Sequence, residues 1–125
     1  TNEDWEDFGR AVCKDSSLTF YDDWVGSAEK TSANAYFLEE KMWPYNPDNE
    51  HTNDFGWNAL PMGYTRNNHT EFEAVGDYGF WWSASEKNSD QAYYRYIYKD
   101  LSSFPMNYTS KTDFGASVRC VRIAR

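Results

Sequence analysis

The chain has 125 residues, enough for one domain with a core of its own. Its formal net charge of −8 argues against nucleic acid and anionic membrane surfaces as partners, because both are bound mostly through Lys and Arg. No apolar run approaches the 18 or so residues of a membrane span, and no signal peptide is recognisable.

The apolar residues are mainly aromatic. The chain has 6 Trp, 10 Tyr and 8 Phe, against 11 Val, Leu and Ile. Large flat side chains pack well across strands and also form recognition surfaces. Charge is uneven as well, with 13 acidic and 4 basic residues in 1–54. We expect the basic cluster Arg119, Arg122 and Arg125 to pair with this acidic half, or simply to be solvated.

The first segment predicts a helix over residues 2–13. Thr1 and Asp4 have the spacing of a capping pair, and acidic residues favour the positive end of a helix. Trp5, Phe8 and Val12 recur at spacings of three and four, which gives one apolar stripe.

A second helix is predicted over residues 33–42, and it has to end before Pro44 because the residue preceding a proline disfavours helical geometry. Residues 44–56 are polar and rich in Pro and Asn, which predicts a loop. Residues 57–64 predict a strand, in which Pro61 indicates an edge or a bulge. Residues 65–79 predict a connecting loop.

Three aromatic or β-branched runs in the last third predict antiparallel strands over residues 79–85, 92–98 and 117–123. In the second of these, Tyr94 and Tyr96 share one face, while Arg95 and Ile97 share the other. Because the second face carries the charge, we expect it to be the solvent side. The predicted fold class is therefore α+β.

The two cysteines, Cys13 and Cys120, lack neighbouring ligands at zinc-site spacing. They are either two buried free thiols or a disulfide that joins the first helix to the last strand. A disulfide would close a loop of about a hundred residues, which the chain-entropy model values at about 4–5 kcal/mol. It would also imply an oxidising compartment.

The sequence offers no catalytic constellation. His51 and His69 fall in predicted loops without a serine or cysteine beside them, so we expect ordinary surface histidines. The adjacent carboxylates Asp22 and Asp23, like Glu39 and Glu40, are expected to be solvated, since neighbours in sequence seldom face one cleft. We therefore expect no enzymatic activity.

An acidic loop is a candidate metal site. Asn46, Asp48, Glu50 and Asp54 supply oxygen ligands at a density that suits a hard cation such as Ca²⁺. The alternative is a plain acidic turn without an ion. No cofactor is required by either interpretation.

The aromatic surplus also suits ligand binding. Tyr and Trp faces stack on sugars, and protein interfaces are enriched in Tyr, Trp and Arg. The candidates are the expected outward residues of strand 92–98 and the loop 99–113 that follows it, because loops on a rigid scaffold carry binding. These residues are Tyr93, Arg95, Phe104, Met106 and Tyr108.

Four segments together resemble a known family, the Fibrobacter succinogenes major paralogous domain. They are Asp54-Phe-Gly-Trp-Asn-Ala-Leu-Pro-Met-Gly-Tyr64, Gly79-Phe-Trp-Trp-Ser-Ala84, Ala92-Tyr-Tyr-Arg-Tyr96 and Ser117-Val-Arg-Cys-Val-Arg122. The helix with Trp5 and Phe8 fits the family pattern loosely. The family portion that precedes this helix is not represented, so we expect an N-terminally shortened member or a fragment.

The resemblance implies one C-type-lectin-like domain over residues 1–125, with two short helices packed on a small, twisted antiparallel sheet with long loops. It also implies secretion and association with a bacterial cell surface. A disulfide between the first helix and the last strand is typical of lectin-like folds, which favours the Cys13–Cys120 bridge.

The expected function is therefore a non-catalytic extracellular module that recognises a polysaccharide or a surface protein. The alternative is a structural subunit or spacer of a surface assembly. An enzyme of the formylglycine-generating type, which a similar fold houses and which uses reactive cysteines, is the remaining and less favoured alternative.

Overall fold

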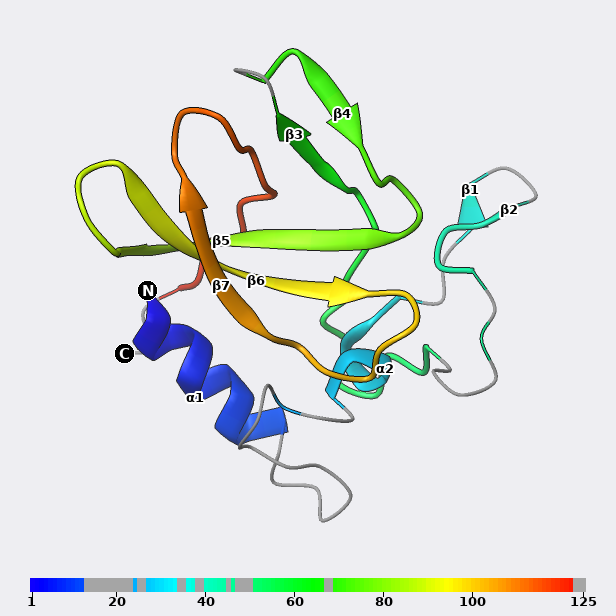
Figure 1. Ribbon diagram of the computed structural model, residues 1–125. Coiled ribbons are helices and arrows are strands. Elements are labelled where there is room, and N and C mark those ends of the chain that lie inside the picture. The colour runs from blue at the N-terminus through cyan, green and yellow to red at the C-terminus, as the bar shows by residue number, and fades with distance from the viewer. Residues whose placement is uncertain are drawn as a thin grey trace.

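The computed structural model describes residues 1–12, 24, 27–33, 36–37, 40–44, 46, 51–66 and 69–122. It has a mixed α+β architecture, with the helix α1 (Asn2–Val12), a helical turn α2 (Ser27–Thr31) and small antiparallel sheets (Figure 1). The strands are β1 (Tyr36–Phe37), β2 (Glu40–Lys41), β3 (Tyr64–Arg66), β4 (Glu71–Glu73), β5 (Tyr78–Glu86), β6 (Gln91–Tyr98) and β7 (Met106–Ser110).

The largest described sheet has the order β5-β6-β7, while β1-β2 and β3-β4 form separate hairpin pairs. The β5–β6 register is regular from Tyr78↔Tyr98 to Trp82↔Tyr94 and shifts between Trp82 and Glu86. The chain after β7 returns to the outer edge of β5, where Ser117 bridges Trp81. The predicted strands 79–85 and 92–98 are confirmed as β5 and β6.

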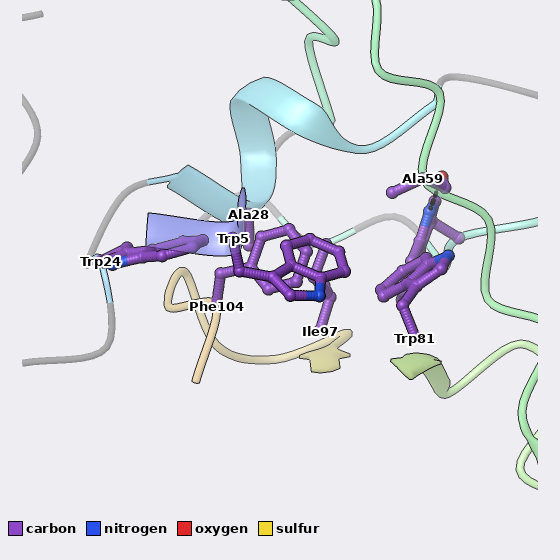
Figure 2. Close-up of a cluster of buried hydrophobic side chains, with 8 residues drawn as sticks. Trp5, Trp24, Ala28, Ala59, Trp81, Ile97 and Phe104 are labelled. Atoms are coloured by element: carbon purple, nitrogen blue, oxygen red, sulfur yellow. Dashed lines mark hydrogen bonds between the residues drawn. The ribbon is translucent and has the colours of Figure 1, made fainter. Parts of the chain in front are cut away.

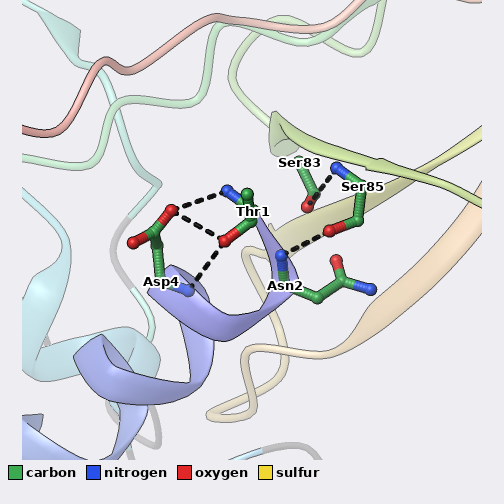
Figure 3. A network of polar contacts seen from close by, with 5 residues as sticks. All are labelled: Thr1, Asn2, Asp4, Ser83 and Ser85. Atoms are coloured by element: carbon green, nitrogen blue, oxygen red, sulfur yellow. Dashed lines mark hydrogen bonds and ion pairs between the residues drawn. The ribbon is translucent and has the colours of Figure 1, made fainter.

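The predicted first helix is confirmed, with an end at Val12. Its capping pair forms as expected, because the Thr1 hydroxyl accepts a hydrogen bond from the Asp4 amide at 3.2 Å (Figure 3). The terminal ammonium and the Thr1 hydroxyl both bond the Asp4 carboxylate and lower its pKa. The Asn2 amide donates to the Ser85 hydroxyl at 2.7 Å, which ties the start of α1 to β5.

The core is built around Phe104, whose side chain is fully buried (Figure 2). Five aromatic rings lie with their centroids 5.6–6.4 Å from the Phe104 ring, mostly in edge-to-face geometry. These rings belong to Trp5, Phe8, Trp24, Trp57 and Trp81. Aromatic pairs of this kind stabilise a core beyond the area that they bury.

Close packing of α1 against this core requires a glycine. A side-chain carbon at Gly9 would collide with the indole ring of Trp24. Gly9 therefore lets Trp24 lie directly on the helix, next to the Phe104 ring.

The expectation that Arg95 and Ile97 face solvent is wrong. Ile97 is fully buried and Arg95 is only 7% exposed. The Arg95 guanidinium lies 3.8 Å from the centre of the Trp24 ring, and its Nη1 donates to the Phe104 carbonyl at 2.9 Å. A guanidinium is weakly hydrated and stacks on aromatic faces, so a charged residue can occupy the core face here.

Other predicted elements differ from the structure. The helix over 33–42 is wrong, because β1 and β2 pair there as Tyr36↔Lys41 and Phe37↔Glu40. A short isolated helix depends on packing, and here the buried Trp43 indole instead donates to the Ala59 carbonyl at 2.9 Å. The strand over 57–64 is reduced to single bridges at Ala59 and Gly63 before β3 begins.

The predicted loops contain additional strands. Residues 65–79 include β4 and most of β3, and residues 99–113 include β7. The last predicted strand, 117–123, is wrong beyond Ser117, since residues 118–122 lie in no strand. No described helix is both long and apolar enough to cross a membrane.

The structure does not contain the expected disulfide. Cys120 is free and exposed, while Cys13 lies outside the described residues. Cys120 lines a groove together with Thr1 and Asp4 at the start of α1.

Replacing Phe104 with alanine should lower the free energy of unfolding by about 3–5 kcal/mol, because it removes the ring at the centre of the core. Urea unfolding followed by circular dichroism measures the change. The matched control is Met106→Ala, two residues away and exposed, which should cost less than about 1 kcal/mol. Equal effects of the two substitutions would contradict this description of the core.

The Cys120 thiol should react with a maleimide in the native protein, because it is exposed and free. Intact mass and peptide mapping, without reductant, would locate the adduct at Cys120. A Cys120 that reacts only after reduction would show that the bridge forms after all.

Candidate functional site

The face of the β5–β6 pair that points away from Phe104 is covered by aromatic side chains. Because side chains alternate along a strand, burial of Arg95 and Ile97 places Tyr94, Tyr96 and Tyr98 together on this opposite face. Flanking rings extend it from β3, β5 and the segment after β7. We call this surface the tyrosine face; its members are Tyr64, Tyr78, Phe80, Trp82, Tyr94, Tyr96, Tyr98 and Phe114.

The rings of the tyrosine face form one continuous layer. Tyr78 stacks on Tyr98 with centroids 4.5 Å apart, and Phe80 stacks on its cross-strand partner Tyr96 at 5.6 Å. Phe114 stacks on Tyr94 at 5.2 Å. Apart from the buried Phe80, every member is half-buried, so each retains a solvent-exposed part.

Carboxylates border the tyrosine face. The Tyr64 hydroxyl donates to Glu73 Oε2 at 3.0 Å, and this hydrogen bond raises the pKa of Tyr64. A hydrogen bond to Asp100 likewise raises the pKa of Tyr98. Asp100 also accepts a hydrogen bond from Asn46 Nδ2 at 3.3 Å. The surface thus combines flat apolar rings with hydroxyl donors and fixed acceptors at its border.

A pair of opposite charges lies at the turn after β6. Lys99 Nζ is 3.0 Å from Asp77 Oδ1, and this contact raises the pKa of Lys99.

Burial is the main cause that raises the pKa of Tyr94. The tyrosines with a shifted pKa therefore stay protonated at neutral pH, which keeps their hydroxyls available as donors.

The predicted ligand-binding residues are divided by the fold. Arg95 and Phe104 belong to the core and are not surface residues. Tyr93, Met106 and Tyr108 remain at the surface, with the Tyr93 and Tyr108 rings 6.0 Å apart and Lys87 Nζ 3.8 Å from the centre of the Tyr108 ring. This small cluster lies on the opposite face from the tyrosine face.

The sequence contains a signal for the tyrosine face. The alternation of Tyr94, Tyr96 and Tyr98 in β6 is visible in the sequence, as is that of Tyr78, Phe80 and Trp82 in β5. The rule that the charged face is the solvent face reversed the assignment, because it did not allow for a buried Arg95.

The predicted calcium ligands are not brought together among the described residues. Asp48 and Glu50 lie outside those residues. Asn46 bonds Asp100, and Asp54 is 4.0 Å from Lys30 Nζ. Within the described part of the chain, no group of three His, Cys, Asp or Glu side chains is placed to hold a metal ion.

The two histidines have different environments. His69 is exposed, as expected. His51 is buried, contrary to the prediction, and its ring stacks on Trp43 with centroids 5.1 Å apart. Neither ring nitrogen of His51 has a hydrogen-bond partner among the described residues. Burial, and to a lesser degree the charge of Lys41, lowers its pKa from 6.5 to about 4.

A separate groove runs beside the start of α1. Its volume is about 460 Å³, and it is enclosed by the first turns of α1, Trp57, residues 82–84 of β5 and the C-terminal segment 118–121. Trp5, Phe8 and Trp82 contribute aromatic walls. Of the sequence-predicted site residues that the structure describes, Cys120 is the one that lines it.

The burial of neutral His51 should make stability depend on pH. The imidazole is neutral in the folded state down to about pH 4 but titrates near 6.5 when unfolded. Its contribution is therefore fully present above pH 6.5 and is lost as pH falls from 6.5 to about 4. Urea unfolding at pH 7 and pH 4.5 measures the loss, which His51→Phe should reduce.

If His51→Phe and the parent lose the same stability between the two pH values, the buried imidazole is not responsible.

The chain matches the model of the Fibrobacter succinogenes major domain over residues 1–122. No curated protein and no solved structure is significantly similar to it. The matched range includes α1, the strands β1 to β7 and the C-terminal segment through Arg122. The chain therefore belongs to the Fibrobacter succinogenes major domain family.

Proposed function

We propose that the chain is a non-catalytic binding module that holds a polysaccharide on the tyrosine face. The observation that carries the proposal is the cross-strand ladder of half-buried rings, from Tyr78 with Tyr98 to Trp82 with Tyr94.

The geometry of the ladder suits a chain of sugar rings. Side chains two residues apart along a strand are separated by about 6.6–6.8 Å, and neighbouring strands by about 4.7–4.9 Å. The result is a continuous array of aromatic side chains, each of them partly exposed apart from Phe80. The C–H groups on the apolar side of a pyranose carry partial positive charge, which is attracted to the negative face of an aromatic ring.

Polar groups at the border supply the directional part of recognition. Sugar hydroxyls donate well to carboxylates, and Glu73 and Asp100 are already held in place by tyrosine hydroxyls. The tyrosine hydroxyls can exchange these partners for sugar hydroxyls. Few side chains need to be ordered on binding, because their rings are already packed against one another.

The proposal includes a location and a finer fold. We propose that the module acts outside the cell or at its surface, where polysaccharides are accessible. We also propose that the α+β arrangement is of the C-type-lectin-like kind, as the family resemblance implies. The packing of α1 beside β5 supports this assignment. No cofactor is part of the proposed mechanism.

A second candidate function, a structural subunit or spacer of a surface assembly, is favoured by a different observation. Phe72 at β4 and Val75 just after it are both exposed. Large exposed apolar side chains occur at surfaces that another protein covers. Sedimentation analysis separates the two functions, since a spacer should self-associate or require a partner, whereas the binding module should be monomeric with a saturable ligand.

Replacing Tyr96 with alanine should weaken polysaccharide binding about tenfold or more, because it removes a central ring of the ladder. Affinity electrophoresis against a panel of neutral β-linked glucans, xylans and uronic-acid polymers measures the change. Circular dichroism confirms that the variant is folded.

The matched control is Tyr93→Ala, which removes the neighbouring tyrosine on the opposite face of β6. It should bind the same polymer as well as the parent protein. If no polymer is retarded, or if Tyr93→Ala weakens binding as much as Tyr96→Ala, the tyrosine face is not the binding surface.

A further inference from the structure

The hydrogen-bond donors at the border of the tyrosine face are already engaged by carboxylates of the chain itself. The Tyr64 hydroxyl donates to Glu73 Oε2 at 3.0 Å. The Tyr98 hydroxyl bonds Asp100, which also accepts a hydrogen bond from Asn46 Nδ2 at 3.3 Å. A ligand that reaches this border therefore meets hydroxyl donors that are each held by an acid.

The arginine at this border is engaged in the same way. In the β3–β4 register, Tyr64 is opposite Glu73 and Arg66 is opposite Glu71, and alternate residues of a strand share a face. Arg66 Nε lies 3.3 Å from Glu71 Oε2, and its Nη2 pairs with Glu73 Oε1. One guanidinium thus faces two carboxylates, so its positive charge is already balanced within the border.

Asp100 accepts its hydrogen bonds from neutral donors, within the part of the chain that the structure describes. These donors are Tyr98 and Asn46. The neighbouring Lys99 has its Nζ 3.0 Å from Asp77 Oδ1, and the contact with Asp77 acts on Lys99 more strongly than the charge of Asp100 does. Asp100 therefore places a negative charge beside the Tyr98 ring.

Sugar hydroxyls and sugar carboxylates differ in how they fit between Tyr98 and Asp100. A hydroxyl both donates and accepts, so it can accept from the phenol and donate to the carboxylate. An ionised carboxylate can only accept. It would take the Tyr98 donor and leave Asp100 opposite a like charge, with an acceptor that has lost its partner. The negative faces of the aromatic rings disfavour an anion as well.

We propose that the tyrosine face selects polysaccharides whose sugar units carry hydroxyls and rejects those built of uronic acids, with Asp100 as a residue that determines this specificity. The inference rests on the proposed function, because it concerns the same face. One like charge at about 6 Å in water weakens binding by about threefold, and repeated acidic units add the repulsion of the rings and of Glu73.

Matched pairs of oligosaccharides test the selectivity. The first pair is the hexamer of β-1,4-linked glucose and the hexamer of β-1,4-linked glucuronic acid; the second pair is the corresponding hexamers of mannose and mannuronic acid. Within a pair, the backbone and the linkage are the same. Isothermal titration at pH 7 and low salt should show the neutral member binding at least about tenfold more tightly. The difference should narrow towards 1 M salt, where the Debye length falls to about 3 Å.

A substitution at Asp100 tests the assigned residue. Asp100→Asn keeps the shape of the side chain and one acceptor oxygen for Tyr98, but it removes the charge. The ratio of neutral to acidic affinity should therefore fall by about threefold. The matched control is Glu3→Gln, which changes the net charge by the same amount at an exposed position of α1, on the Phe104 side of the sheet. This control should leave the ratio unchanged, and circular dichroism checks the fold of both variants.

Three outcomes would overturn the inference: equal affinity for the two members of each pair, an unchanged ratio in Asp100→Asn, or an equal change of the ratio in Glu3→Gln. Equal binding of neutral and acidic hexamers that is weakened by Tyr96→Ala would refute the selectivity and leave the polysaccharide module intact. If no hexamer and no polymer binds, the proposed function itself fails, and the selectivity fails with it.

Discussion

The interaction on which the rest of the structure depends is the contact between Arg95 and the residues around Phe104. One guanidinium stacks on Trp24 and donates to the Phe104 carbonyl. It thereby joins β6, the connection before β7 and the residue that lies on α1. With only 11 aliphatic Val, Leu and Ile residues in the chain, the core is filled with indole and phenyl rings. Such rings need their edges and faces arranged, and Arg95 fixes part of that arrangement.

The same contact decides which side of the sheet is available for recognition. Once Arg95 and Ile97 lie inside, Tyr94, Tyr96 and Tyr98 have to lie on the other side. Their rings are too numerous to be hidden by the short hairpin β3-β4, so they remain half-buried. The position of the core and the position of the candidate site therefore both follow from which face of β6 is buried.

The sequence predicted α1, β5 and β6 because each has a strong local period. Their boundaries differ from the observed ones by one residue. It did not predict β7, since Met106-Asn-Tyr-Thr-Ser110 has no clear alternation and pairs only because β6 is beside it. The 33–42 helix was predicted wrongly because the Trp43 indole bonds the Ala59 carbonyl, a tertiary contact that no periodic pattern in the sequence indicates. The solvent side of β6 was predicted wrongly for the same reason, because Trp24, on which Arg95 stacks, is distant in sequence.

The strict alternation of β6 also limits how this chain can vary between relatives. Adding or deleting one residue within Gln91–Tyr98 would exchange its two sets of side chains, moving tyrosines into the core and the guanidinium out of it. Length changes are compatible with the fold only in connections, such as residues 87–90 before β6 and 99–105 after it. Differences among family members are therefore expected as substitutions within strands and as insertions between strands.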